Sequence, residues 1–214
     1  MKKIYGIYVN DANYPTQWTE EGNRVLCPFF KTWKGMISRC SAPSVIKSRP
    51  TYIDVEVEQS WHYFMTFKGW MEKQEWKGLS LDKDILSFGD KLYSAENCAF
   101  VPDYINNLLI SRQNDRGLYP LGVTKIRDVR MVNELKKAYS AGISSKYLKR
   151  YLGVFATPME AHREWQKAKM FTIAKSLEEY RNEKFFNPRV EQALMARLAA
   201  ISEDFNNQKE TFKI

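Results

Sequence analysis

The run Thr157-Pro158-Met159-Glu160 constrains the fold most, because it is a capping box that fixes where a helix begins. In a capping box the threonine side chain accepts the N–H of the third helical residue, whose glutamate side chain accepts the threonine N–H. Proline suits the first helical position, where its missing N–H is not needed. The helix therefore starts at Pro158, and its buried stripe should comprise Ala161, Trp165, Ala168 and Thr172.

Three extended segments precede this helix, at residues 121–126, 130–138 and 147–155. Three strands followed by one helix predict a compact sheet-and-helix unit. Alternation in the last segment places Leu148, Leu152 and Val154 on one face together with Arg150. The remaining residues, 176–214, read as helical with an interruption near Asn187-Pro188, and Ala193, Leu194, Leu198 and Ile201 should face inward.

The first half of the chain predicts a different mixture of elements. Strands are expected at 3–9 and 51–57, a helix at 28–40, and aromatic core residues at helical spacing from Trp61 to Trp76. Pro43 and Pro50 should break the chain into a loop. A further strand at 81–86, a turn at 87–91, an extended segment ending at Phe100 and a helix opened by Pro102 complete the pattern. The expected fold class is α+β, with functional parts at 1–112, 113–175 and 176–214.

Positive charge is concentrated in one part of this 214-residue chain, whose net charge is +8. Residues 1–112 hold 14 Lys/Arg and 13 Asp/Glu. Residues 113–175 hold 13 Lys/Arg but only 5 Asp/Glu, and residues 176–214 hold 6 Lys/Arg and 7 Asp/Glu. The middle segment thus carries the whole excess. A basic patch on an otherwise neutral protein favours a polyanionic partner, most commonly nucleic acid, over a basic surface kept for solubility.

Composition restricts the other classes of function. No apolar run approaches the roughly 20 residues that cross a bilayer, and the first residues lack a signal peptide's apolar stretch, so a cytoplasmic location without membrane association is expected. The three cysteines, Cys27, Cys40 and Cys98, fit a reducing compartment and buried thiols better than a disulfide framework or a zinc site. No protein partner is indicated by the sequence.

One set of residues has the composition of a divalent-metal site. Asp82 lies on the strand expected at 81–86, and Asn106 lies 24 residues later on the helix opened by Pro102. A strand–turn–strand–helix unit could bring this carboxylate and this amide to one Mg²⁺ or Mn²⁺ ion. Asp-Lys-Asp followed by a distant asparagine is weak evidence when taken alone, because a charged hairpin would have the same sequence.

The same region resembles the core of HNH endonucleases of the phage and homing type. The resemblance is carried by 81–86, Gly89, Lys91, the run Tyr93-Ser94-Ala95-Glu96-Asn97-Cys98, Phe100-Val101-Pro102 and Asn106. Upstream residues including Cys27-Pro28-Phe29, Trp33, Arg39-Cys40, Pro50-Thr51-Tyr52 and Trp70-Met71 also resemble that group. The resemblance implies a ββα-metal fold for the core and phosphodiester hydrolysis in DNA, by nicking or by double-strand cleavage.

Residues 120–161 resemble a second family, the APETALA-type (ethylene-response-factor) DNA-binding domain. Pro120-Leu121-Gly122-Val123 and the run from Leu152 through Ala161 carry this resemblance. It implies three strands packed on one helix, with the sheet in contact with duplex DNA. Phage endonucleases of the first family carry such a domain behind the nuclease core, so the resemblance extends over nearly the whole chain.

The first resemblance assigns roles to five residues. Asp82 and Asn106 match metal-binding positions, and Asn97 matches the asparagine that fixes the loop. Lys83 stands where the family has a histidine that acts as general base, and a lysine needs a strongly lowered pKa for that role. Asp84 or a metal-bound hydroxide could serve instead. The sequence therefore predicts a metal-dependent DNA endonuclease and leaves open a protein that binds DNA without cutting it; an RNA-binding protein fits less well.

Six basic residues are expected on or between the three strands of the second region. Strands can place such side chains on phosphates and base edges in the major groove. The predicted DNA-contacting residues are Lys125, Arg127, Arg130, Lys136, Lys149 and Arg150.

Overall fold

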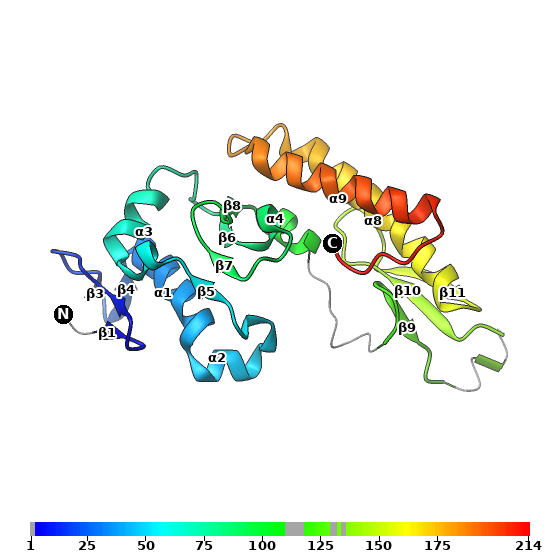
Figure 1. Ribbon diagram of the computed structural model, residues 1–214, viewed down its shortest axis with the longest axis horizontal. Helices are drawn as coiled ribbons and strands as arrows, with labels where there is room; N and C mark the ends of the chain where they lie inside the picture. Colours follow the sequence, from blue (N-terminus) through cyan, green and yellow to red (C-terminus); the bar gives the residue numbers. More distant parts are fainter. Residues whose placement is uncertain (1–2, 110–117, 129–131, 134–135) are drawn as a thin grey trace. The chain divides into compact units, whose positions relative to one another are not determined.

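The computed structural model describes residues 3–109, 118–128, 132–133 and 136–214, and the chain divides into two compact units (Figure 1). The first unit is Met1–Val101 and the second is Pro102–Ile214, and each is described by itself. Both mix short strands with helices, which confirms the α+β class. No helix among the described residues is long and apolar enough to cross a membrane.

Two short hairpins open the first unit. β1 (Lys3–Ile4) pairs with β2 (Tyr8–Val9), and β3 (Gln17–Glu20) pairs with β4 (Asn23–Leu26), both antiparallel. The continuous strand expected at 3–9 is therefore wrong. Tyr5 and Gly6 both adopt positive φ, which reverses the chain between β1 and β2.

Helices form the centre of the first unit. α1 (Pro28–Ser41) confirms the helix expected at 28–40. The loop expected after it is wrong, because α2 (Pro43–Ser48) and the 3-10 helix η1 (Pro50–Tyr52) both begin at a proline. A proline at the first helical position starts a helix as readily as a proline inside one breaks it.

The aromatic residues pack these helices together, as the helical spacing predicted. α3 (Phe64–Met71) follows the 3-10 helix η2 (Gln59–His62) and packs against α1. Trp33 and Trp61 are fully buried, and the indole N–H of Trp33 donates to the Trp61 carbonyl at 2.8 Å. The shared core also buries Phe30, Met36, Ile37, Phe64, Phe67 and Met71.

Two pairs of short strands position the candidate metal site. β5 (Glu56–Val57) lies parallel to β7 (Leu92–Tyr93), and β6 (Ser80–Asp82) lies antiparallel to β8 (Ala99–Val101). The strand expected at 51–57 is thus reduced to two residues, since η1 and a positive φ at Asp54 precede it.

The strand expected at 81–86 ends at Asp82. The side chain of Asp82 accepts the N–H groups of Asp84 and Ile85, which turns the chain into the short helix α4 (Asp84–Ser87). The hydrogen bonds that the Asp82 side chain accepts from the backbone therefore stop the strand that the alternation of residues 81–86 predicted.

The second unit begins with α5 (Asp103–Asn106), which starts after Pro102 as expected, and with the 3-10 helix η3 (Asn107–Leu109). Its sheet has the antiparallel order β11–β10–β9, from β9 (Val123–Lys125), β10 (Tyr139–Gly142) and β11 (Tyr151–Phe155). The middle strand thus starts later than the expected 130–138, because Val132 and Asn133 are helical and Lys136 has φ 53°.

One long helix, α8 (Pro158–Tyr180), covers one face of this sheet (Figure 1). The capping box is confirmed: Thr157 Oγ1 accepts the Glu160 N–H at 3.2 Å, and Glu160 Oε2 accepts the Thr157 N–H at 3.4 Å. The predicted stripe is also confirmed as buried. The helix continues through residue 175, where a functional boundary was expected.

A second long helix, α9 (Pro188–Asn206), packs along α8 and is capped by the Asn187 side chain. The segment after it returns to α8. There His162, which is fully buried, contacts the Leu121 carbonyl through Nδ1 at 2.9 Å and accepts the Thr211 N–H at Nε2. The C-terminal segment is thereby attached to the sheet-and-helix unit.

Candidate nucleic-acid interface and candidate metal site

The sheet of the second unit presents a polar face opposite α8. Val123, Ala141 and Gly153 are cross-strand neighbours on the face that packs toward α8, so Thr124, Ser140 and Val154 are neighbours on the other face. Thr124 and Ser140 share a hydrogen bond at 2.8 Å between their hydroxyl oxygens. The centre of this open face is therefore small and uncharged.

A β-bulge adds an aromatic residue to the exposed surface. The register shifts between Ala141 and Gly142, so that Tyr151 lies opposite Gly142, and Tyr151 is 61% exposed. Leu152 instead packs against the core. The expected common face for Leu152 and Val154 is wrong, because the bulge inserts one residue and reverses the alternation.

None of the predicted DNA-contacting cations that the structure describes lies in the centre of this face. Lys125 is exposed at the end of β9, where its pairing with Tyr139 places it on the α8 side of the sheet. The others that the structure describes lie in loops and are also exposed: Arg127, Lys136, Lys149 and Arg150. Arg130 lies outside the described residues. Sequence reasoning missed Thr124 and Ser140 as open-face residues, because only strand register could assign them to this face. The alternation in 147–155 did predict that Tyr151 points away from Leu152.

Asp82, the predicted metal ligand, already has a structural role. Its Oδ1 accepts the backbone N–H groups of Ile85 at 2.7 Å and of Asp84 at 2.9 Å. Burial raises the pKa of the Asp82 carboxyl above its usual value; the Ile85 hydrogen bond opposes this shift and the charge of Asp84 adds to it. One carboxylate with an engaged oxygen can still serve as a single Mg²⁺ ligand, since magnesium keeps several waters.

Lys83 stands where a general base is expected from the sequence, and its side chain is buried in an ion pair. It is 6% exposed, and its Nζ lies 2.5 Å from Asp84 Oδ1 and donates to the Asp90 carbonyl at 3.1 Å. The ammonium also lies 5.9 Å from the centre of the Tyr93 ring. The Nζ of Lys83 is thus engaged by a carboxylate and by a backbone carbonyl, which is the arrangement of a structural ion pair.

Asn97 holds the loop between β7 and β8. Its Nδ2 donates to Asp90 Oδ2 at 3.0 Å and to the Leu92 carbonyl at 3.1 Å. Because Asp90 also accepts from Lys83, this residue links Asn97 to the end of β6. The structure thus groups four of the predicted site residues in the first unit: Asp82, Lys83, Asp84 and Asn97.

Asn106, the other predicted metal ligand, belongs to the second unit and is partly buried at the end of α5. Asp82 belongs to the first unit, and its pairing with Asn106 stays a prediction. Among the described residues no group of three or more His, Cys, Asp or Glu side chains gathers as a metal site.

The cysteines lie in the first unit. Burial raises the pKa of the Cys40 thiol to about 11 and that of the Cys98 thiol to about 12. Both thiols therefore stay protonated at neutral pH, whereas a zinc ligand is a thiolate. Their environment suits packing.

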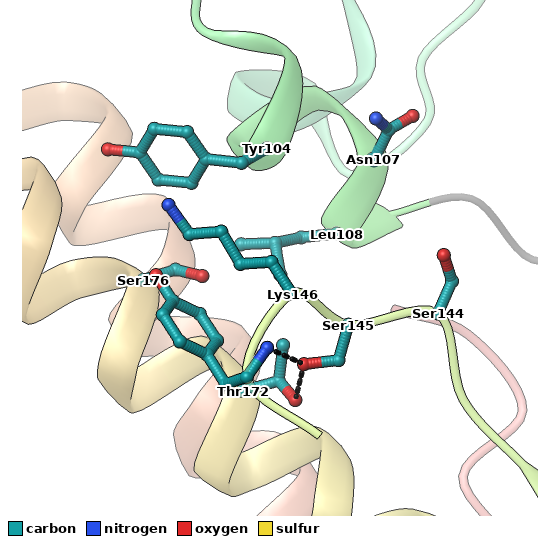
Figure 2. Close-up of a pocket in the computed structure, with 9 residues that line it drawn as sticks. Tyr104, Asn107, Leu108, Ser144, Ser145, Lys146, Thr172 and Ser176 are labelled. Atoms are coloured by element: carbon teal, nitrogen blue, oxygen red, sulfur yellow. Dashed lines mark hydrogen bonds between the residues drawn. The ribbon is translucent and has the colours of Figure 1, made fainter. Parts of the chain in front are cut away.

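A pocket of about 320 Å³ lies in the second unit, between η3, the loop before β11 and α8 (Figure 2). Lys146 crosses it, with its ammonium 3.7 Å from the centre of the Tyr104 ring and paired with Glu179. Thr172 donates to the Ser145 hydroxyl at 3.0 Å on the same wall. These contacts fix the loop that continues into Lys149 and Arg150.

Comparison with known proteins adds no family to these observations. No family model, no curated protein and no solved structure matches the chain.

Proposed function

We propose that this protein binds duplex DNA through the open face of the β9–β10–β11 sheet. One observation carries the proposal: in the part of the chain that the structure describes, the face of the antiparallel sheet opposite α8 has a small, neutral centre, and the exposed cations Lys149 and Arg150 precede its edge strand β11. Two- and three-stranded sheets fit the major groove, whose width admits them.

The distribution of charge suggests how each part would contact DNA. Peripheral lysines and arginines would contact phosphates on both sides of the groove, and each such contact releases bound counterions. Thr124 and Ser140 would let the sheet approach the base edges closely, because neither side chain is large. Binding would therefore depend steeply on salt concentration.

The test is duplex binding measured by fluorescence anisotropy across a series of salt concentrations. Replacing Lys149 and Arg150 with alanine should weaken binding and lower the slope of log affinity against log salt by roughly one for each lost phosphate contact. Lys184→Ala is the control, since Lys184 is an exposed lysine between α8 and α9. Equal slopes for all three proteins would rule out the proposed surface.

The second candidate function is DNA cleavage with Mg²⁺ or Mn²⁺. It is favoured by the position of Asp82, which ends β6 opposite Ala99 of β8, beside a loop that Asn97 fixes. Asp82 would hold the metal, which when bound would stabilise negative charge on a phosphodiester and its leaving oxygen. Lys83 would supply a fixed positive charge, and Asp84 is the carboxylate next to it.

A supercoiled plasmid distinguishes cleavage from binding alone. The informative variant is Asp82→Asn, because asparagine keeps an oxygen that can accept the Asp84 and Ile85 N–H groups while it removes the charge. Asp54→Asn is the matched control at an exposed aspartate. Nicked or linear DNA that EDTA and Asp82→Asn both abolish, and Asp54→Asn does not, would support the endonuclease.

A bound but uncut plasmid would support the alternative of an inactive nuclease core. The ion pair between Lys83 and Asp84 is the observation that favours this alternative, because it occupies the two groups that could otherwise accept a proton.

A further inference from the structure

The first unit contains a largely buried guanidinium that lacks an acidic partner. Arg39, in the last turn of α1, makes no ion pair among the described residues. Its Nε is buried without a hydrogen-bond partner in that part of the chain. Charged groups removed from water are normally paired with an opposite charge, because an unpaired one is costly to desolvate.

The surroundings of Arg39 keep it charged. Its guanidinium carbon lies 5.6 Å from the centre of the Tyr93 ring, and the guanidinium is hydrogen-bonded to the Tyr52 side chain, so only its Nε is buried without a partner among the described residues. Burial alone would lower the pKa of Arg39, but Tyr93 and Tyr52 more than offset this and raise it above its usual value. A fixed positive charge therefore faces these rings at every working pH.

A second cation lies against the same ring. The ammonium of Lys83 is 5.9 Å from the centre of the Tyr93 ring, and its carboxylate partner is Asp84. Asp82, at the end of the neighbouring strand, uses Oδ1 to accept two backbone N–H groups. Two cations, Arg39 and Lys83, thus lie around one ring, and the carboxylates beside Lys83 are engaged by Lys83 itself and by backbone N–H groups.

We infer that Arg39 and Lys83 form a binding site for a phosphate group in the first unit. Arg39 would bind the phosphate oxygens directly, since a planar guanidinium matches phosphate geometry, and Lys83 would contribute through its charge. Arg39 as a whole is only partly buried, so its side chain remains in contact with solvent. Where the phosphate belongs to DNA, this inference rests on the proposed function and places a second DNA contact outside the sheet.

The test measures the thermal midpoint of the full-length protein in sodium phosphate and in sodium chloride of equal ionic strength. The wild-type midpoint should rise saturably with phosphate. Arg39→Met should weaken phosphate binding by roughly ten- to a hundredfold, the usual loss for a hydrogen bond to a charged group. Arg49→Met, at an exposed arginine of the same unit, should behave as the wild type.

Two further measurements complete the test. The first keeps it valid if Arg39→Met does not fold, and the second identifies the source of the phosphate. Arg39→Lys keeps the charge but loses the planar donor set, so it should keep the midpoint in chloride and still bind phosphate more weakly. An arginine-specific dicarbonyl reagent should modify Arg39 of the wild-type protein more slowly when inorganic phosphate or a short duplex is present. Protection by duplex alone would assign the phosphate to DNA, and protection by both would indicate a general phosphate site.

No saturable effect of phosphate on the wild type, with no protection of Arg39 by either probe, would show that Arg39 is a structural cation only and overturn the inference. Phosphate binding that Arg39→Met leaves unchanged would overturn it as well. Failure of the sheet proposal is a separate result, because it would appear in the Lys149 and Arg150 variant and leave phosphate binding by the first unit intact.

Discussion

Replacing Gly122 with alanine should destabilise the second unit by about 2–5 kcal/mol. Gly122 precedes β9 with φ +77°, a backbone conformation that costs other residues roughly 1–2 kcal/mol. A Cβ built there would lie 1.9 Å from Cδ1 and 2.1 Å from Cγ of Trp165, so the ring or the strand must move. Overpacking of this kind typically costs about 1–3 kcal/mol more.

The assay is urea unfolding of the full chain, followed by far-UV circular dichroism. Gly78→Ala is the matched control, because Gly78 has φ +75° and nothing within 4 Å of the added Cβ, so it carries the backbone cost alone. A double-mutant cycle of Gly122→Ala with Trp165→Ala should show a coupling of about 1–3 kcal/mol, as the smaller side chain relieves the clash.

Two results would refute this reasoning. One is a Gly122→Ala variant that loses no more stability than Gly78→Ala. The other is a cycle that is additive within about 0.5 kcal/mol, which would mean that Trp165 does not determine the cost.

Three further changes in the second unit have predictable effects. Thr157→Ala should lower its unfolding free energy by about 1 kcal/mol in urea, because the Glu160 N–H loses its acceptor; an unchanged midpoint would contradict the capping role. His162→Phe should cost about 2–4 kcal/mol and expose the segment 207–214 to limited proteolysis, since the Leu121 carbonyl and the Thr211 N–H both lose their partner. Burial lowers the pKa of Lys169 to about 8 in the folded protein, whereas the unfolded lysine keeps an ordinary pKa of about 10.4. The unfolding free energy of the wild type should therefore increase by up to about 3 kcal/mol as the pH rises from about 8 to about 10.4, because over this range only the unfolded state binds the proton. Lys169→Met should remove that pH dependence, and parallel stability curves for the two proteins would contradict the assignment.

Local signals in the sequence determined several elements of the structure. The capping box at Thr157, the helix at 28–40 and the buried aromatics of the first unit all follow from contacts within a few residues or from helical spacing. Because these signals act over one or two turns, no distant part of the chain is needed to interpret them. The concentration of basic residues in 113–175 likewise needs no coordinates.

Other features depended on competition between local preferences. The alternation at 81–86 predicted a strand, but the side chain of Asp82 captures two backbone N–H groups and starts a helix. The prolines at 43 and 50 predicted a loop, yet each begins a helical segment. In both cases two conformations satisfy the sequence pattern, and packing selects one.

The sequence alone predicts the mixture of helices and strands and the position of the positive charge. Which residues share a surface depends on the tertiary structure: the bulge that exposes Tyr151 and packs Leu152 against the core, the ion pair that engages Lys83, and the position of Arg39 beside Tyr93. The physical reason is that register, ion pairing and burial depend on residues far apart in the chain, and one inserted residue in a strand reverses every face beyond it.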